Sequence, residues 1–129
     1  MFDLPDDFDL MLLSGCYLEM VCFGIHLTRL DFARPQLAPG VARYKVSFCI
    51  EGGLTYSVTD VGGRRDFSDS FSSAPLLDFL LKDVVSVEEL ESSTLKILFD
   101  SGDFIVIEGD NDGFESYSIA LNSGDIVVV

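Results

Sequence analysis

Short apolar runs, rich in β-branched and aromatic residues, recur along this 129-residue chain. Runs of this length, bounded by Gly, Pro, Asn, Asp and Ser, are typical of β-strands. The strands that we predict are 17–23, 26–32, 44–51, 54–59, 84–90, 94–99, 104–108, 114–121 and 126–129. Short hairpin turns at 100–103 and 122–125 connect neighbouring strands, and they predict an antiparallel arrangement.

Two segments depart from this strand pattern. Residues 73–81 begin with Ser73, carry Pro75 in the first turn and have apolar residues at helical spacing. This pattern predicts a short amphipathic helix. A weaker pattern of the same kind predicts a second helix over 6–13. The segment 62–73 is rich in Gly, Ser and Asp, which indicates an exposed, mobile connection.

The chain contains an internal repeat. Residues 17–32 align without gaps on residues 84–99, so that Phe23 meets Leu90. After a ten-residue insertion that forms the Pro-containing loop 34–42 in the first copy, Ile-Glu-Gly at 50–52 matches the same tripeptide at 107–109. Each copy then continues into a fourth strand.

That fourth strand carries Tyr-Ser-Val in the first copy and Tyr-Ser-Ile in the second, so that Tyr56 matches Tyr117. The copies, 17–59 and 84–121, represent either a true duplication or two similar meanders. The fold class that we expect is α+β and mostly β, with antiparallel sheets built from two similar four-strand meanders joined by one short helix. One domain over 1–129 is expected at this length.

The charge is strongly negative, since 22 Asp and Glu oppose 8 Lys and Arg, a formal charge of −14. A hydrophobic content of 48% excludes a disordered acidic tail. The charge argues against direct binding to nucleic acid and to an anionic membrane surface, because both require clustered cations. Three cysteines, an acidic N-terminus and no uniformly apolar span predict a cytoplasmic protein without a signal peptide or membrane anchor.

Catalytic signatures are sparse. His26 is the one histidine, and we interpret it as a half-buried strand residue. No nucleophile elbow, phosphate-binding loop or zinc spacing occurs, so we expect no cofactor and no resident metal. Residues 108–113 reproduce part of a calcium loop, but Ile119 occupies the position of its bidentate Glu. We interpret this segment as a hairpin turn and leave calcium binding at Asp110 and Asp112 open.

Carboxylates concentrate in the second half of the chain. A focused negative surface speeds encounter with a cationic partner, which predicts a docking face for a basic protein. The candidate partner-binding residues are Glu88, Glu89, Glu91, Asp100, Asp103, Glu108, Asp110, Asp112, Glu115 and Tyr117. The alternatives are a solvated negative surface, a core role for Tyr117, and a hydrolase that uses Glu108 and Asp110, although the chain has no Trp to line a sugar cleft.

The second half also resembles a known group of proteins. Phe-Asp-Ser-Gly at 99–102, the strand ending in Ile-Glu at 107–108, and 112–119 are similar to the C-terminal half of small bacterial proteins. Some of these resemble immunity proteins encoded beside polymorphic or contact-dependent toxins. The resemblance covers 84–129 well and 15–32 loosely, supplies no catalytic residues, and departs at the insertion 34–42.

The resemblance implies a cytoplasmic immunity protein that binds and neutralises a cognate toxin, expected to be a basic nuclease domain. The alternative is a non-enzymatic binding or self-assembly module. In that case the apolar strand 125–129 would pair with a second copy, giving a homodimer, or with the edge of a partner.

Overall fold

The computed structural model describes residues 2–129, and within them the chain is mostly β. Ten strands form two antiparallel sheets of five strands each, with the order β1-β2-β3-β9-β10 in the first sheet and β5-β4-β8-β7-β6 in the second. The strands are β1 (Tyr17–Phe23), β2 (Thr28–Ala33), β3 (Lys45–Ile50), β4 (Leu54–Val58), β5 (Val61–Arg64), β6 (Val84–Glu89), β7 (Leu95–Phe99), β8 (Phe104–Ile107), β9 (Tyr117–Ala120) and β10 (Ile126–Val128). The expected antiparallel, mostly β chain is thereby confirmed.

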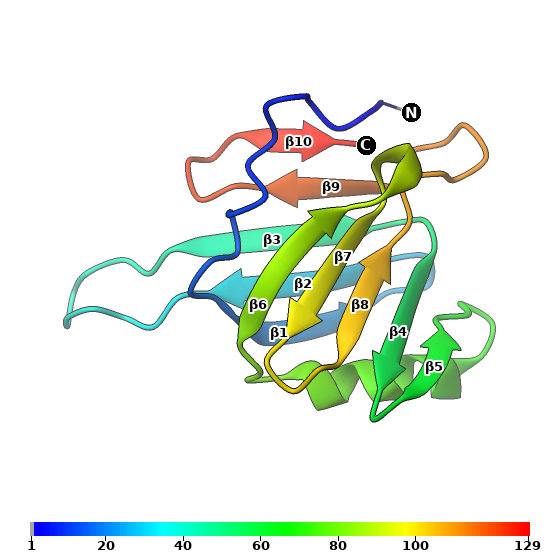
Figure 1. Cartoon of the computed structure of the whole chain (residues 1–129), viewed down its shortest axis with the longest axis horizontal. Helices are drawn as coiled ribbons and strands as arrows, with labels where there is room; N and C mark the ends of the chain where they lie inside the picture. Colours follow the sequence, from blue (N-terminus) through cyan, green and yellow to red (C-terminus); the bar gives the residue numbers. More distant parts are fainter. Residues whose placement is uncertain (1) are drawn as a thin grey trace.

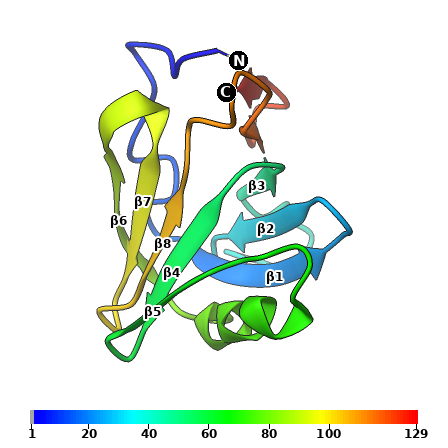
Figure 2. The same ribbon diagram turned by 90° about the vertical axis from the view of Figure 1, so that its right-hand side faces the viewer.

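The two sheets lie face to face, and their strands cross (Figures 1 and 2). The 3₁₀ helix η1 (Ser70–Phe79) connects β5 to β6 and lies beneath the sheets, in contact with β1, β4 and β5. A single helical turn, η2 (Glu91–Ser93), connects β6 to β7 at the opposite end of the molecule.

The core fills the space between the sheets, because alternate residues of β2, β3, β4, β7, β8 and β9 face inward. Its buried side chains are Leu18, Leu30, Phe32, Val46, Phe48, Ile50, Tyr117 and Ile119 from the first sheet, and Leu54, Tyr56, Leu95, Ile97, Phe99, Ile105 and Ile107 from the second. Phe32 stacks on Phe99 between the sheets with ring centroids 6.5 Å apart. Phe99 also contacts Phe79 of η1 at 4.9 Å, so that one ring joins all three layers.

The two halves of the chain have the same topology. β1, β2 and β3 form a meander in the first sheet, and the chain then crosses to the second sheet as β4 and β5. β6, β7 and β8 form a meander in the second sheet, and the chain crosses back as β9 and β10. The fourth strand of each half therefore lies beside the meander of the other half, rather than extending its own meander as expected.

The strand registers show that the two halves correspond differently in the structure than in the gapless sequence alignment. Phe23 lies opposite Thr28, and Glu89 lies opposite Leu95, so the β6–β7 connection is one residue longer than the β1–β2 connection. Phe23 therefore corresponds to Glu89 and not to Leu90. A gapless alignment cannot represent this insertion.

The fourth strands also shift. Ile50 lies opposite Tyr117 in the first sheet, and its counterpart Ile107 lies opposite Leu54 in the second. Tyr117 thus corresponds to Leu54 in position, and not to Tyr56. The two tyrosines are alike in sequence context but occupy different levels of the core.

Local structure differs from expectation in three segments. The helix spans Ser70–Phe79 rather than 73–81, because the Asp69 carboxylate caps it by accepting from the Phe71 N–H at 3.0 Å. Residues 6–13 form turns with bonds such as Phe8 N–H to the Pro5 carbonyl (3.0 Å), and they do not continue into a helix. The segment 62–73, expected to be an exposed connection, begins instead within β5.

Glycine explains why β5 forms without an apolar pattern. A Cβ at Gly63 would lie 2.6 Å from the ring of Tyr56, its partner on β4, so this position requires a residue without a side chain. The chain then reaches Arg65, which is 8% exposed. Part of the expected mobile connection is therefore ordered and buried.

Candidate functional site

The β7–β8 hairpin separates the predicted carboxylates into two groups. The turn between β7 and β8 carries Asp100 and Asp103. Asp110 follows β8 at the other end of the hairpin, beside η2, which carries Glu91 and precedes β7 (Figure 1). We call the second group, with the neighbouring Asp3, the acidic end of the molecule. The acidic end consists of Asp3, Glu88, Glu89, Glu91, Asp110, Asp112 and Glu115, all exposed.

A close backbone contact builds this end. Gly109 packs on η2 so tightly that a Cβ there would lie 1.9 Å from the Ser92 carbonyl oxygen. The Gly109 N–H donates to Thr94 Oγ1 (3.0 Å), and its carbonyl accepts from Ser116 Oγ (2.8 Å). These bonds hold the loop 109–116 beside η2 and so bring its carboxylates next to those of β6.

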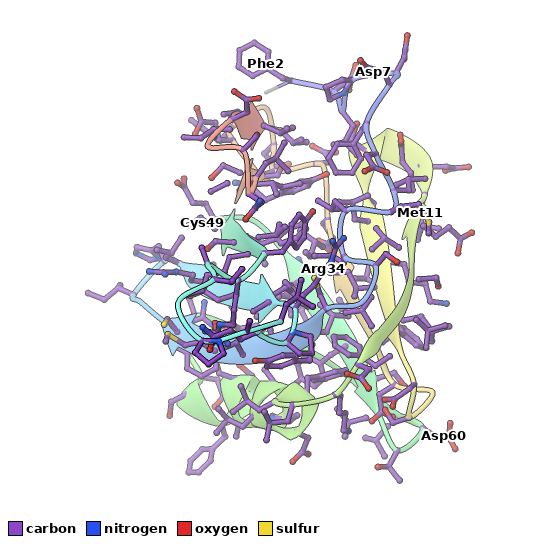
Figure 3. All side chains as sticks on the ribbon, turned by 90° about the vertical axis from the view of Figure 1, so that its left-hand side faces the viewer. Phe2, Asp7, Met11, Arg34, Cys49 and Asp60 are labelled. Atoms are coloured by element: carbon purple, nitrogen blue, oxygen red, sulfur yellow. The ribbon has the colours of Figure 1, made fainter. Side chains whose placement is uncertain are left out.

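Ser93 holds the N-terminal segment at the same end. Its hydroxyl accepts from the Leu4 N–H (2.9 Å), which places Asp3 at the acidic end. The sequence carries no local signal for this contact, because the two residues are 89 positions apart. In Figure 3, Phe2 and Asp7 mark this end of the molecule, and Asp60 in the β4–β5 turn marks the opposite end.

Tyr117 supports the acidic end from within. It is 1% exposed, and its hydroxyl donates to the Ser93 carbonyl at 2.7 Å. Burial raises the pKa of the Tyr117 hydroxyl, and the nearby Glu89 raises it further. The side chain is thus a neutral core group that anchors η2 from below the surface.

Two other predicted residues are held in ion pairs. Glu108 accepts two bonds from the Arg64 guanidinium, one of them at 3.0 Å. Asp103 is 8% exposed and accepts from Lys82 Nζ (2.8 Å) and from the Thr59 N–H (2.9 Å). The pKa of Asp103 lies below its ordinary value, chiefly because of the bond from Lys82 and then because of that from Thr59.

The carboxylates of the acidic end form no ion pair within residues 2–129, although Glu88 lies opposite Lys96 in the β6–β7 register. The ion pairs formed among residues 2–129 are Arg29–Asp31, Arg43–Glu19, Arg64–Glu108 and Lys82–Asp103. None of them includes a carboxylate of the acidic end. Seven like charges on three neighbouring segments therefore face solvent together, and they attract cations over about a Debye length, roughly 8 Å at physiological salt.

The calcium-like segment is a turn in the β8–β9 connection, which crosses from the second sheet to the first, so the expected hairpin was wrong. Asp110 Oδ1 accepts from the Asp112 N–H (3.2 Å), the Asn111 amide donates to the Glu115 carbonyl (2.9 Å), and Ile119 is buried in β9. Across residues 2–129, no three His, Cys, Asp or Glu side chains gather in a way that could hold a metal ion.

His26 lies elsewhere than expected. It is exposed in the turn between β1 and β2, where it meets Phe67 edge to face at 5.7 Å, and it does not lie within a strand. Cys16 is buried, whereas Cys22 and Cys49 are half-buried. The helices that the structure describes are all too short or too polar to span a bilayer.

Comparison of the chain with protein-family models, with curated proteins and with solved structures finds no match.

Proposed function

We propose that this protein is a non-enzymatic binding protein that recognises a basic protein partner through its acidic end. The observation that supports this proposal is the gathering of seven exposed carboxylates, none in an ion pair with another residue of 2–129, on one end of the folded chain. Such a surface accelerates encounter with a cationic partner and disfavours anionic ones.

Within this class we favour an immunity protein that neutralises a toxin domain. A nuclease must bind phosphates and therefore presents clustered cations around its active site. An inhibitor with a rigid array of carboxylates would occupy the same surface by charge complementarity. The bonds of Gly109 and Ser93 support this proposal because they hold the carboxylates on ordered segments.

The test is growth rescue in cells that express the product of the neighbouring gene. The acidic-end variant carries Glu89→Lys, Glu91→Lys and Glu115→Lys, none of which removes a side-chain hydrogen bond within residues 2–129. We expect the wild-type chain to restore growth and this variant to fail.

A matched control separates local charge from total charge. The variant Asp78→Lys, Asp83→Lys and Asp100→Lys reverses three exposed carboxylates at the opposite end, and it changes the net charge equally. It should restore growth like the wild type. A neighbouring gene product that is not toxic, or equal rescue by all three chains, would contradict the proposal.

Self-assembly through an edge strand is the second candidate. β10 is the last strand of the first sheet, and Ile126 on it is 67% exposed. An exposed edge strand can pair with a second copy. Light scattering at high protein concentration distinguishes the two candidates, because a protein that stays monomeric excludes self-assembly.

A further inference from the structure

Arg65 is a buried cation that forms no ion pair with any other residue of 2–129. Its side chain donates from Nε to Ser73 Oγ (2.9 Å), from Nη1 to Thr28 Oγ1 (2.6 Å) and from Nη2 to the Gly24 carbonyl (3.0 Å). All three acceptors are neutral. Among residues 2–129, no carboxylate oxygen lies within 4.0 Å of its nitrogens. A guanidinium has five N–H donors, and within residues 2–129 three of them are used in hydrogen bonds.

This arrangement is costly unless an anion completes it. Burying a charge without a partner is unfavourable, and burial lowers the pKa of Arg65. The adjacent Asp66 carboxylate forms no ion pair with Arg65, and its Oδ1 accepts from the Ser68 N–H (2.9 Å) and hydroxyl (2.7 Å). Within residues 2–129 the charge of Arg65 is therefore unpaired, and a partner can supply the carboxylate.

A pocket of about 220 Å³ gives access to Arg65. It opens between the β1–β2 turn, the segment after β5 and the start of η1, which lie together in Figure 2. The guanidinium carbon lies 5.1 Å from the centre of the Phe23 ring and 4.5 Å from that of Phe67. The pocket is large enough for a carboxylate but small for most free ligands.

Exposed apolar side chains belong to the lining of the pocket, which also includes Asp66, or directly follow lining residues in the sequence. Phe67 lines the pocket and is 38% exposed. Ile25 follows the lining residue Gly24 and is 83% exposed, and Phe71 follows the lining residue Ser70 and is 85% exposed. Large apolar side chains that surround a polar centre are typical of a protein interface. A small anion would neutralise Arg65 but would leave these side chains in water.

We propose that Arg65 receives the carboxylate of an Asp or Glu side chain from a partner protein, whose adjacent apolar side chains cover Ile25, Phe67 and Phe71. This arginine pocket is distinct from the acidic end and recognises the opposite charge. The test of this proposal is therefore independent of the test of the function proposed above.

The test is an NMR titration of the full chain with the blocked tripeptide acetyl-Leu-Glu-Leu-amide. The readouts are the side-chain Nε–H signal of Arg65 and the backbone amides of Gly24 and Thr28. We expect these signals to shift, and the analogue acetyl-Leu-Gln-Leu-amide to bind about tenfold more weakly because it cannot form the charged pair. Sodium acetate and inorganic phosphate, titrated alone, should shift them less than the Glu peptide.

Two variants at exposed positions keep the test independent of folding. Phe71→Ser should weaken binding of the Glu peptide, whereas Phe2→Ser, which removes a 64% exposed ring at the other end of the molecule, should leave it unchanged. The proposal is overturned if the Glu and Gln peptides behave alike, if neither shifts the Arg65 signals, or if Phe71→Ser has no effect. Acetate or phosphate acting as strongly as the peptide would also overturn it, since the pocket would then be a site for free anions.

Discussion

Replacement of Asp103 by Asn should destabilise the fold without touching the proposed binding surface. The Asp103 carboxylate lies at the base of the β7–β8 turn, 8% exposed, and bonds both the Lys82 ammonium and the Thr59 N–H. Asn retains an acceptor for Thr59 but presents an uncharged amide to Lys82. The substitution therefore removes a charge-assisted bond and leaves a half-buried cation without its partner.

The magnitude follows from these contacts. A hydrogen bond to a charged group contributes about 1.5–3 kcal/mol. The Lys82 side chain is 28% exposed, so solvent screens part of the interaction, and about 2 kcal/mol is a reasonable expectation. With an unfolding entropy of about 2.1 cal/mol/K per residue, this loss lowers Tm by about 7 °C.

The effect should depend on pH. The pKa of Asp103 is lowered in the folded state, first by Lys82 and then by Thr59, from an ordinary value of 3.8. The stabilisation is therefore fully present above that value and is lost as the pH falls through the lower folded-state pKa. The difference in unfolding free energy between the wild type and Asp103→Asn should shrink in that acidic range.

Urea unfolding followed by circular dichroism measures both effects. Asp100→Asn is the matched control, since Asp100 is exposed in the same turn and its side chain forms no hydrogen bond within residues 2–129. The reasoning is refuted if Asp103→Asn is as stable as the wild type at neutral pH, or if Asp100→Asn loses as much.

Two further predictions concern other parts of the fold. Gly109→Ala should lower the free energy of unfolding by about 1–3 kcal/mol, because its Cβ would lie 1.9 Å from the Ser92 carbonyl oxygen. A thermal melt measures this, and an unchanged Tm would contradict the close contact. Burial raises the pKa of the Cys16 thiol, so iodoacetamide should modify Cys22 and Cys49 first, and mass spectrometry that finds Cys16 modified at the same rate would contradict its burial.

The strands could be predicted from the sequence where one face is buried. The run 17–23 coincides with β1, and the alternation in 94–99 anticipates β7, whose inward residues Leu95, Ile97 and Phe99 fill the core. β5 was not predicted, because this strand forms where Gly63 leaves room for the ring of Tyr56 on β4. No local sequence pattern encodes such a contact between strands.

The sheet to which each strand belongs could not be read locally. The chain leaves the first sheet after Ile50, where the N–H groups of Glu51 and Gly52 both donate to the Ser116 carbonyl at 2.9 Å. This contact joins segments more than sixty residues apart, and it forms only in the assembled fold. Similar apolar strands on either side of the crossing would equally suit a continuous meander.

The location of the candidate residues could be predicted only in part, again because contacts between distant segments determine it. Carboxylate density in the sequence identifies Glu91, Asp110 and Glu115, which lie together at the acidic end. It cannot show that Asp103 and Glu108 are taken up by cations distant in sequence. The burial of Arg65 could not be predicted from a local pattern either, because three segments that are separate in the sequence surround it.

The most direct test of the acidic end is the affinity for the neighbouring gene product as a function of salt. Calorimetric titrations should show that the wild-type chain and the Asp78, Asp83 and Asp100 control bind alike and weaken as salt rises. Reversal of Glu89, Glu91 and Glu115 to Lys should raise Kd by about tenfold or more and flatten the salt dependence. Equal affinities and equal salt dependence for all three chains would show that the acidic end is not the binding surface.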